Sequence, residues 1–442
     1  MHRAAKEDLL SWKQRSSRLP LLLQGARQTG KTYLLEAFGQ DAFPAYHRFD
    51  FAEEPRLSTV FEQNLTPERI IRDLSILRGV DIDLVRDLII FDEVQECPRA
   101  VTSLKYFAEK SLGSFVVASG SLLGTGLGDS LFPVGKIERL QLCPMTFHEF
   151  LLGVGQERLA DAIGSASLRE PFSEVVHDKI WEWLKTYFIV GGLPGVVNVF
   201  REHRSDLRQA YKKTREAQAR LAADYLSDIS KHSGKTKAVR VEAVFKNVPI
   251  GLARETKGNR KFVFKDVLPN ASRYSTLEGP IEWLVKAGLV HKVLICADVE
   301  RPLAACANER RFKLYLFDVG LLGAMAGLSP AVIHSYDYGS YKGYFAENFV
   351  LQELFQSLGC RLYSWNRNVS EIEFLLETED GVVPIEVKAG INKKAKSLGV
   401  FMERYKPGQS VLFSGRPLMA IEGRGKLQLP LYAASQLGRF LN

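Results

Sequence analysis

The chain has 442 residues, of which 46% are hydrophobic and 25% are charged, as in an ordinary soluble globular protein. Its five cysteines are odd in number and none stand at Cys-x-x-Cys spacing, which excludes a disulfide framework and a zinc knuckle. The formal net charge of +8 gives weak support to a polyanionic partner such as nucleic acid.

Neither the N-terminal residues nor the longest apolar stretch has the pattern of a membrane-inserted segment, so we expect no membrane partner. The first residues, MHRAAKEDLLSWKQ, are charged throughout and lack the apolar segment of a signal peptide. The longest apolar stretch, WLKTYFIVGGLPGVVNVF, contains Lys185, two glycines and a proline, and is a poor membrane span. We therefore expect a cytoplasmic protein of about three domains.

The first strong motif is a phosphate-binding loop. Residues 21–23 form a short apolar run typical of a buried parallel strand, and a helical pattern covers residues 32–38. Between them lies a Gly-x4-Gly-Lys-Thr motif, made of Gly25, Ala26, Arg27, Gln28, Thr29, Gly30, Lys31 and Thr32. Its N–H groups are predicted to bind ATP phosphates, Lys31 the β- and γ-phosphates, and Thr32 Mg²⁺. The strand–loop–helix context disfavours a chance glycine turn.

Polar residues follow two further apolar runs. Residues 88–91 end in Asp92 and Glu93. Asp92 is predicted to bind Mg²⁺, directly or through water, and Glu93 to activate the attacking water as general base. Taken alone, two helix-capping acids would be the simpler interpretation, but the preceding phosphate loop favours the catalytic one. The next strand, at residues 115–118, ends in Ser119 and Ser121, which either sense the γ-phosphate or form a plain turn.

Together, GARQTGKT, IIFDEVQ, VVASGS, CPMTFHEF and GGLP, in this order and spacing, resemble bacterial and archaeal AAA-type ATPases of the STAND-related group. The resemblance covers nearly the whole chain. It implies a five-stranded parallel core, a helical lid, a winged helix and a C-terminal PD-(D/E)xK nuclease-like domain. Such proteins carry a Gly-Arg pair, a candidate arginine finger, where this chain has Gly135-Lys136, with Arg139 nearby. Lysine does not reproduce a bidentate arginine contact with phosphate, so which residue replaces it stays open.

The middle of the chain is predicted to be helical to about residue 226, with a break at GGLP that the resemblance assigns to a nucleotide-contacting lid. The basic run at residues 201–221 is most simply a solvated helix face. A helix near 277–285 and strands at 289–295 and 313–318 fit a winged helix. Its candidate DNA contacts are Lys257, Arg260, Lys261, Lys265, Arg273 and Tyr274. Protein binding, or packing on the ATPase, is the alternative.

The C-terminal region contains the stretch VPIEVKAG. The resemblance places a metal-binding set at Glu347 on a helix, Glu373 on a second strand and Glu386 on a third, with Lys388 beside them. Neighbouring strands lie about 4.8 Å apart, so Glu373 and Glu386 can share one Mg²⁺. Lys388 would orient water or neutralise charge. The alternative is a half-buried strand with a wet face, in which the fold is kept and the site is idle.

The sequence thus predicts an α/β P-loop NTPase with added modules. These are an AAA-type ATPase core at residues 1–150, a helical lid at 151–226, a winged helix at 227–330 and a restriction-endonuclease-like α/β domain at 331–442. The predicted function is ATP hydrolysis with Mg²⁺, coupled to nucleic-acid binding, DNA rather than RNA, and optionally to cleavage. The alternative is a slow nucleotide-dependent switch that binds a protein partner and has an inactive nuclease-like domain. Homo-oligomerisation stays open.

Overall fold

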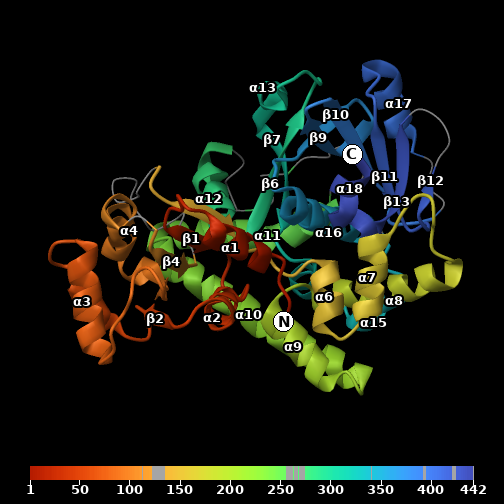
Figure 1. Cartoon of the computed structure of the whole chain (residues 1–442). Helices are drawn as coiled ribbons and strands as arrows, with labels where there is room; N and C mark the ends of the chain where they lie inside the picture. Colours follow the sequence, from red (N-terminus) through yellow and green to blue (C-terminus); the bar gives the residue numbers. More distant parts are fainter. Residues whose placement is uncertain are drawn as a thin grey trace. The chain divides into compact units, whose positions relative to one another are not determined.

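The structure is a computed structural model that describes residues 1–111, 113–121, 135–254, 262, 267, 274–339, 341–391, 395–420 and 425–441. The chain folds into two compact units. The N-terminal unit is residues 2–143 with 286–288, and the C-terminal unit is residue 1 with 144–285 and 289–442. In Figure 1 the N-terminal unit runs from red to orange, and most of the C-terminal unit from yellow to blue. Among the described residues, no helix is long and apolar enough to cross a membrane.

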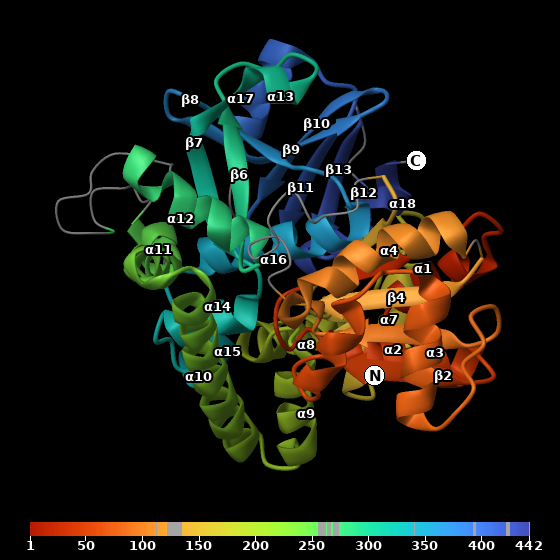
Figure 2. The same ribbon diagram turned by 90° about the vertical axis from the view of Figure 1, so that its left-hand side faces the viewer.

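The N-terminal unit is a five-stranded parallel sheet with helices on both faces (Figure 2). The strand order is β2-β3-β4-β1-β5, and every neighbouring pair is parallel. The strands are β1 (Leu21–Gln24), β2 (Tyr46–Asp50), β3 (Leu88–Asp92), β4 (Phe115–Gly120) and β5 (Glu138–Gln141). The helices are α1 (Ala5–Gln14), α2 (Lys31–Ala42), η1 (Pro55–Phe61), α3 (Pro67–Arg78), η2 (Val94–Glu96) and α4 (Pro98–Lys110). The predicted five-stranded parallel core is confirmed.

Alternating side chains of these strands enter two separate hydrophobic cores. Leu22 and Phe91 pack on one face with residues of α3, α4 and η1. Leu21 and Leu23 pack on the other face with residues of α1 and α2. Because the strands are parallel and buried on both faces, they are apolar runs, and their carboxyl ends meet at one edge of the sheet.

The C-terminal unit begins with a series of helices and ends in a large sheet. Its helices are α6 (Phe147–Gly153), α7 (Glu157–Ser165), α8 (Glu174–Val190), α9 (Pro194–His203), α10 (Leu207–His232), α11 (Lys235–Arg254), α12 (Tyr274–Lys286), α13 (Leu303–Cys306), α14 (Val319–Met325), α15 (Pro330–His334), α16 (Tyr341–Leu358), α17 (Lys396–Tyr405), η5 (Leu431–Gln436) and α18 (Leu437–Leu441). The long helix α10 lies beside α9 (Figure 2). The predicted helical stretch up to residue 226 is present as α6 to α10.

The sheet of the C-terminal unit has eight strands in the order β12-β13-β11-β10-β9-β8-β6-β7. They are β6 (Val290–Cys296), β7 (Ala307–Leu316), β8 (Tyr363–Arg367), β9 (Ser370–Thr378), β10 (Gly381–Val387), β11 (Ser410–Ser414), β12 (Met419–Ala420) and β13 (Lys426–Pro430). The pairs β6–β8, β10–β11 and β11–β13 are parallel, and the other four are antiparallel. The sheet is therefore mixed.

The hairpin that the sequence assigned to a wing forms, as antiparallel β6 and β7. It is part of the eight-stranded sheet, since β6 also pairs in parallel with β8, where Leu294 lies opposite Tyr363. Of the candidate DNA contacts, Tyr274 begins α12. The other five, Lys257, Arg260, Lys261, Lys265 and Arg273, lie outside the described residues.

Candidate functional site

The phosphate loop connects β1 to α2 at the carboxyl edge of the parallel sheet. Gly30 is the N-cap of α2 and has a φ of 89°, a left-handed conformation that glycine adopts without steric cost. Gly25 has no room for a side chain, because a Cβ there would overlap the carbonyl oxygen of Leu142. The two glycines of the motif therefore meet different constraints, and together they bring the loop to the N-terminus of α2, where N–H groups favour an anion.

Lys31 is a buried cation at the centre of this loop. Its side chain is 5% exposed, and its ammonium donates to the carbonyl oxygens of Gly25 and Ala26, at 3.1 Å each. Burial lowers the pKa of Lys31, while the nearby Glu93 and Asp92 oppose that change. Carbonyl oxygens carry only partial negative charge, so a phosphate would give this ammonium a full counter-charge.

Asp92 accepts hydrogen bonds from several polar groups at the strand ends. Its Oδ2 accepts hydrogen bonds from the Thr32 hydroxyl at 2.8 Å and from Arg48 Nε at 3.0 Å. Its Oδ1 accepts from the Ser119 hydroxyl and from the backbone N–H of Glu93. Thr32 and Asp92 thus present two adjacent oxygen ligands of the kind that Mg²⁺ prefers, which fits the predicted metal ligands.

Glu93 and Ser121 lie at the same edge of the sheet. Glu93 has a φ of 51°, which is uncommon for a residue with a side chain, and its carboxylate accepts a hydrogen bond from Gln95. Ser121 follows β4 and is 5% exposed. The Ser119 hydroxyl donates to Asp92, which is the candidate metal ligand.

A second set of charged residues lies in the C-terminal unit, and we call it the carboxylate cluster. It consists of Lys313, Tyr315, Glu347, Glu371, Glu373, Glu386 and Lys388. The register that pairs Ile385 with Phe374 puts Glu386 opposite Glu373, as the sequence predicted. Lys388 Nζ lies 2.7 Å from Glu386 Oε1 and 3.6 Å from Glu373 Oε1. The three therefore lie together.

Glu347 lies near enough to Glu373 and Lys388 to affect the pKa of each, and it also contacts residues outside the predicted set. Its Oε2 accepts from Lys313 at 3.2 Å and from the Tyr315 hydroxyl at 2.9 Å. Lys313 also forms an ion pair of 2.6 Å with Glu371. Among the described residues, no group of three or more His, Cys, Asp and Glu side chains is arranged to hold a metal ion.

The wet strand face of the alternative is wrong, while its idle site stays a prediction. Glu386 is 1% exposed and Glu373 is 6% exposed, because α17 packs on β9 and β10. The backbone N–H groups of Leu398 and Val387 donate to these two carboxylates at 3.0 and 3.1 Å. Burial, helped by Glu347, Glu371 and Glu386 and opposed by Lys388, raises the pKa of Glu373.

Comparison with known families assigns three regions of the chain. Residues 17–151 match a family described as AAA domain. Residues 182–332 and 342–429 match two families that are each described as a domain of unknown function (DUF8612 and DUF4143). The first region is thus similar to AAA domains. This match, together with the phosphate loop, supports nucleotide binding and hydrolysis. No curated protein matches the chain.

Solved structures show only distant likeness. A Walker-type ATPase of Pyrococcus abyssi is 15% identical over 73% of this chain and 95% of its own, with a TM-score of 0.44. The ORC1 protein of Aeropyrum pernix, solved in complex with DNA, is 16% identical over 74% and 92%, with a TM-score of 0.30. A STAND protein of Pyrococcus horikoshii with a tetratricopeptide repeat sensor is 13% identical over 80% and 45%, with a TM-score of 0.28. We draw no functional inference from likeness at this level.

Two arginines of the N-terminal unit, Arg48 and Arg3, were not singled out by the sequence. Arg48 of β2 contacts Asp92, Asp50 and Glu36. Burial alone would lower its pKa, but the hydrogen bond and charge of Asp92 and the other acids outweigh that, and the pKa of Arg48 is raised. Arg3 is 3% exposed and donates to Thr29 O in the phosphate loop at 2.7 Å.

The sequence signals for these two arginines differ in strength. Arg48 could have been identified, because an arginine inside the strand pattern YHRFD is unusual and lies on a strand next to a candidate metal-binding strand. Nothing local identifies Arg3, because its partner is 26 residues away.

The residues at the arginine-finger position are both described. Lys136 forms an ion pair with Glu109 of α4 at 3.3 Å. Arg139 is an exposed residue of β5, opposite Leu22 in the register. Each lies in the N-terminal unit.

The GGLP motif joins α8 to α9 and is held by a buried acid that the sequence did not identify. Asp318 accepts from the N–H of Gly192 at 2.7 Å and of Leu321 at 2.8 Å. A Cβ on Gly191, whose φ is 75°, would overlap the Asp318 carboxylate. Burial raises the pKa of Asp318 to about 6, although these N–H groups and Arg215 oppose the shift. In the C-terminal unit, the motif is thus a tightly packed junction.

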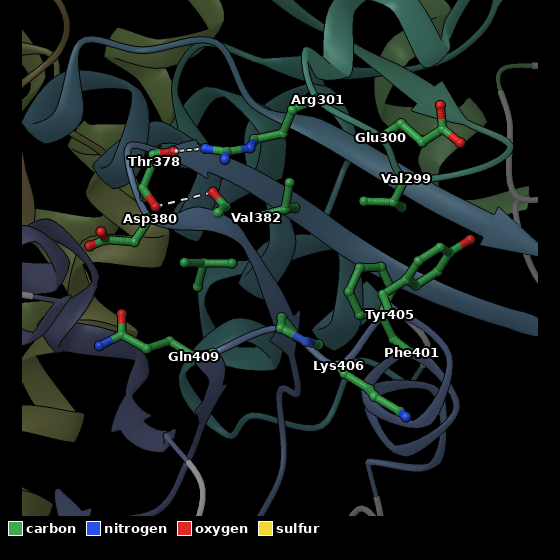
Figure 3. Close-up of a pocket in the computed structure, with 14 residues that line it drawn as sticks. Val299, Glu300, Arg301, Thr378, Asp380, Val382, Phe401, Tyr405, Lys406 and Gln409 are labelled. Carbon is green, nitrogen blue, oxygen red and sulfur yellow. Dashed lines mark hydrogen bonds between the residues drawn. The ribbon is translucent and has the colours of Figure 1, made fainter.

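A pocket of 320 Å³ lies at the turn of the β9–β10 hairpin, the end opposite Glu373 and Glu386 (Figure 3). Figure 3 shows Arg301 reaching toward Thr378, and its guanidinium donates to Thr378 O at 3.2 Å. The rings of Phe401 and Tyr405 form part of the wall, with centroids 4.7 Å apart. The lining mixes both signs of charge with apolar groups, and no single ligand class follows from it.

Proposed function

We propose that the protein binds ATP with Mg²⁺ at the phosphate loop and hydrolyses it. The observation that carries this proposal is the buried Lys31 ammonium, which donates to two carbonyl oxygens of its own loop, 3.1 Å away. The N–H groups of the loop would hold the phosphates, and Lys31 would neutralise charge on the β- and γ-phosphates. Mg²⁺, when bound, would supply charge neutralisation between the phosphates.

The groups around Asp92 suit the remaining tasks. Asp92 and Thr32 would hold the metal, and Ser119 would keep the Asp92 carboxylate in orientation through its hydrogen bond. Glu93 would accept the proton of the attacking water, since it directly follows Asp92 at the strand end. Ser121 is proposed to lie near the γ-phosphate.

We propose two ways in which hydrolysis is used. In the first, ATP turnover is coupled to nucleic-acid binding, DNA rather than RNA, for which the net charge of +8 is the support. In the second, the protein is a slow nucleotide-dependent switch with a protein partner and an inactive nuclease-like domain. The lysine partners of the carboxylate cluster favour the second.

The test is steady-state ATP hydrolysis by the full chain with and without Mg²⁺, in parallel with Lys31→Ala. Mg²⁺-dependent turnover that is lost in Lys31→Ala supports the proposal, and turnover equal in both proteins refutes it. Adding single- and double-stranded DNA or RNA at low salt then separates the two uses. Stimulated turnover supports coupling to nucleic acid, whereas ATP binding with slow, unstimulated turnover supports the switch.

A further inference from the structure

Lys313 is the least expected member of the carboxylate cluster. It lies on β7, at the edge of the sheet, between the buried apolar residues Phe312 and Leu314, and it is itself only 2% exposed. Lys313 and Tyr315 are two residues apart on one strand, so their side chains leave the same face. Both reach Glu347 of α16. A buried lysine in an apolar strand needs an acidic partner, and this one has two.

The two lysines divide the acids between them. Lys313 contacts Glu347 at 3.2 Å and Glu371 at 2.6 Å. Lys388 contacts Glu386 at 2.7 Å and Glu373 at 3.6 Å. The cluster therefore holds four acidic side chains and two lysines, with backbone N–H groups and the Tyr315 hydroxyl as further donors. Each of the four acids has a positively charged neighbour.

This arrangement does not fit the divalent metal that a PD-(D/E)xK domain implies. A hard cation requires several carboxylate or carbonyl oxygens around one point. Here one oxygen of Glu347 and one of Glu371 face the same ammonium, and one oxygen each of Glu386 and Glu373 face the other. A metal ion among them would meet two positive charges at close range. The described part of the chain likewise contains no metal-holding acidic group.

We propose that Lys313 is a built-in counter-ion that takes the place of a divalent cation in the C-terminal unit, which therefore keeps its carboxylate cluster without metal and does not cleave nucleic acid. The proposal is independent of ATP hydrolysis. The Lys313 ammonium compensates the negative charge of carboxylates that burial has removed from water, as a bound cation would. The proposal also predicts a latent metal site that opens when this one positive charge is removed.

The test measures Mn²⁺ binding to the full chain without nucleotide, by electron paramagnetic resonance of the free ion. Wild type and Glu371→Gln are expected to bind equally, because the cluster holds no metal in either. Lys313→Met removes the charge at similar side-chain length, and its Mn²⁺ affinity is expected to rise by about tenfold or more. The gain should disappear in Lys313→Met/Glu371→Gln. Asp92→Asn identifies any ion bound at the phosphate loop.

Two results would overturn the proposal. One is Mn²⁺ bound by wild type and lost in Glu371→Gln, and the other is a folded Lys313→Met, with unchanged ATP hydrolysis, that gains no affinity. If Lys313→Met does not fold, a cleavage assay decides, with labelled DNA and RNA and either Mg²⁺ or Mn²⁺. Wild type is expected to yield no more product than Lys388→Ala. Cleavage that is lost in Lys388→Ala would refute the proposal.

Discussion

The phosphate loop and the carboxylate cluster each place a lysine beside acids, but the partners of the lysines differ. Lys31 donates to two carbonyl oxygens, whereas Lys388 lies 2.7 Å from a carboxylate. The hydrogen bonds of Lys31 thus go to partial charges, with the carboxylates of Glu93 and Asp92 nearby, whereas Lys388 contacts a full negative charge directly. A site that awaits an anionic ligand therefore differs visibly from a site whose charges are already matched within the chain.

The acids show the same contrast. Asp92 is buried at the end of β3, where two hydroxyls, one N–H group and one arginine donate to it. Glu373 and Glu386 are also buried, but they are paired with Lys388 and backbone donors. A motif of the right residue types therefore identifies an element of the fold. Whether the charged groups of that motif bind a ligand depends on the partners that each charge has in the structure.

The largest expected effect is on activity at the phosphate loop. Lys31→Ala should lower the rate of ATP hydrolysis by about 10²–10³-fold, because the charge on the phosphates loses its buried counter-ion. Its thermal unfolding midpoint should change little, since the freed carbonyls can accept hydrogen bonds from water. Lys105→Ala, on the exposed surface of α4, is the matched control. If Lys31→Ala lost much stability and kept its ATP hydrolysis, the contrast between the phosphate loop and the carboxylate cluster would be wrong.

Glu93→Gln should separate binding from hydrolysis. The amide cannot accept the proton of the attacking water, so turnover should fall by about 10²-fold while the affinity for ATP is retained. Fluorescent-nucleotide titration measures the binding, and phosphate release measures the turnover. Glu96→Gln, three residues further along the chain, is the control. Turnover equal to that of wild type would remove Glu93 from the proposed mechanism.

In the carboxylate cluster, the same kind of substitution should act on stability. Lys388→Ala leaves Glu386 and Glu373 without their ammonium partner, and breaking a buried pair costs about 3 kcal/mol. Chemical denaturation of the full chain measures it, with the exposed Lys396→Ala as control. ATP hydrolysis should persist under native conditions. A change as small as that of the control would show that the cluster is not held by its ion pairs.

Ligand binding should stabilise the ATPase domain. Mg²⁺ with a non-hydrolysable ATP analogue at about 100 times its Kd should add about 2.7 kcal/mol to the free energy of unfolding. Calorimetry should show the shift in wild type and not in Lys31→Ala. Mg²⁺ without nucleotide should leave the melting of the C-terminal unit unchanged. A shift there that Glu371→Gln removes would contradict the matched-charge interpretation.

The smallest expected effect concerns pH. Burial raises the pKa of Glu373 from 4.5 to about 8, so the folded protein keeps a proton that the unfolded chain releases. The stabilisation from this group is complete below pH 4.5 and is lost as the pH rises through about 8. Glu373→Gln should make that decline shallower, as measured by chemical denaturation at a series of pH values.

The control for the pH experiment is Glu379→Gln, in the exposed β9–β10 turn. Glu353, whose pKa burial raises to about 8, contributes the same trend to every variant and cancels in the difference. Parallel pH profiles for Glu373→Gln and wild type would show that Glu373 is ionised in the folded state.

The candidate sites differ in how much of them the sequence could predict. The phosphate loop could be predicted because the groups proposed to bind phosphate lie in eight consecutive residues, so their order in the sequence already identifies the site. The pairing of Glu373 with Glu386 was also predictable, because a short turn sets the register of an antiparallel hairpin. Lys313 was not, since its acidic partners Glu347 and Glu371 lie 34 and 58 residues away.

The sequence by itself determined the elements: apolar runs became β1, β3 and β4, and the Gly-x4-Gly-Lys-Thr motif became the loop before α2. These follow from local periodicity and backbone sterics, which act over a few residues. Only the tertiary structure decided that β6 and β7 join the eight-stranded sheet and that Lys313 meets Glu347 and Glu371. Strand order and buried charge pairing depend on segments distant in sequence, and packing alone selects which of them meet.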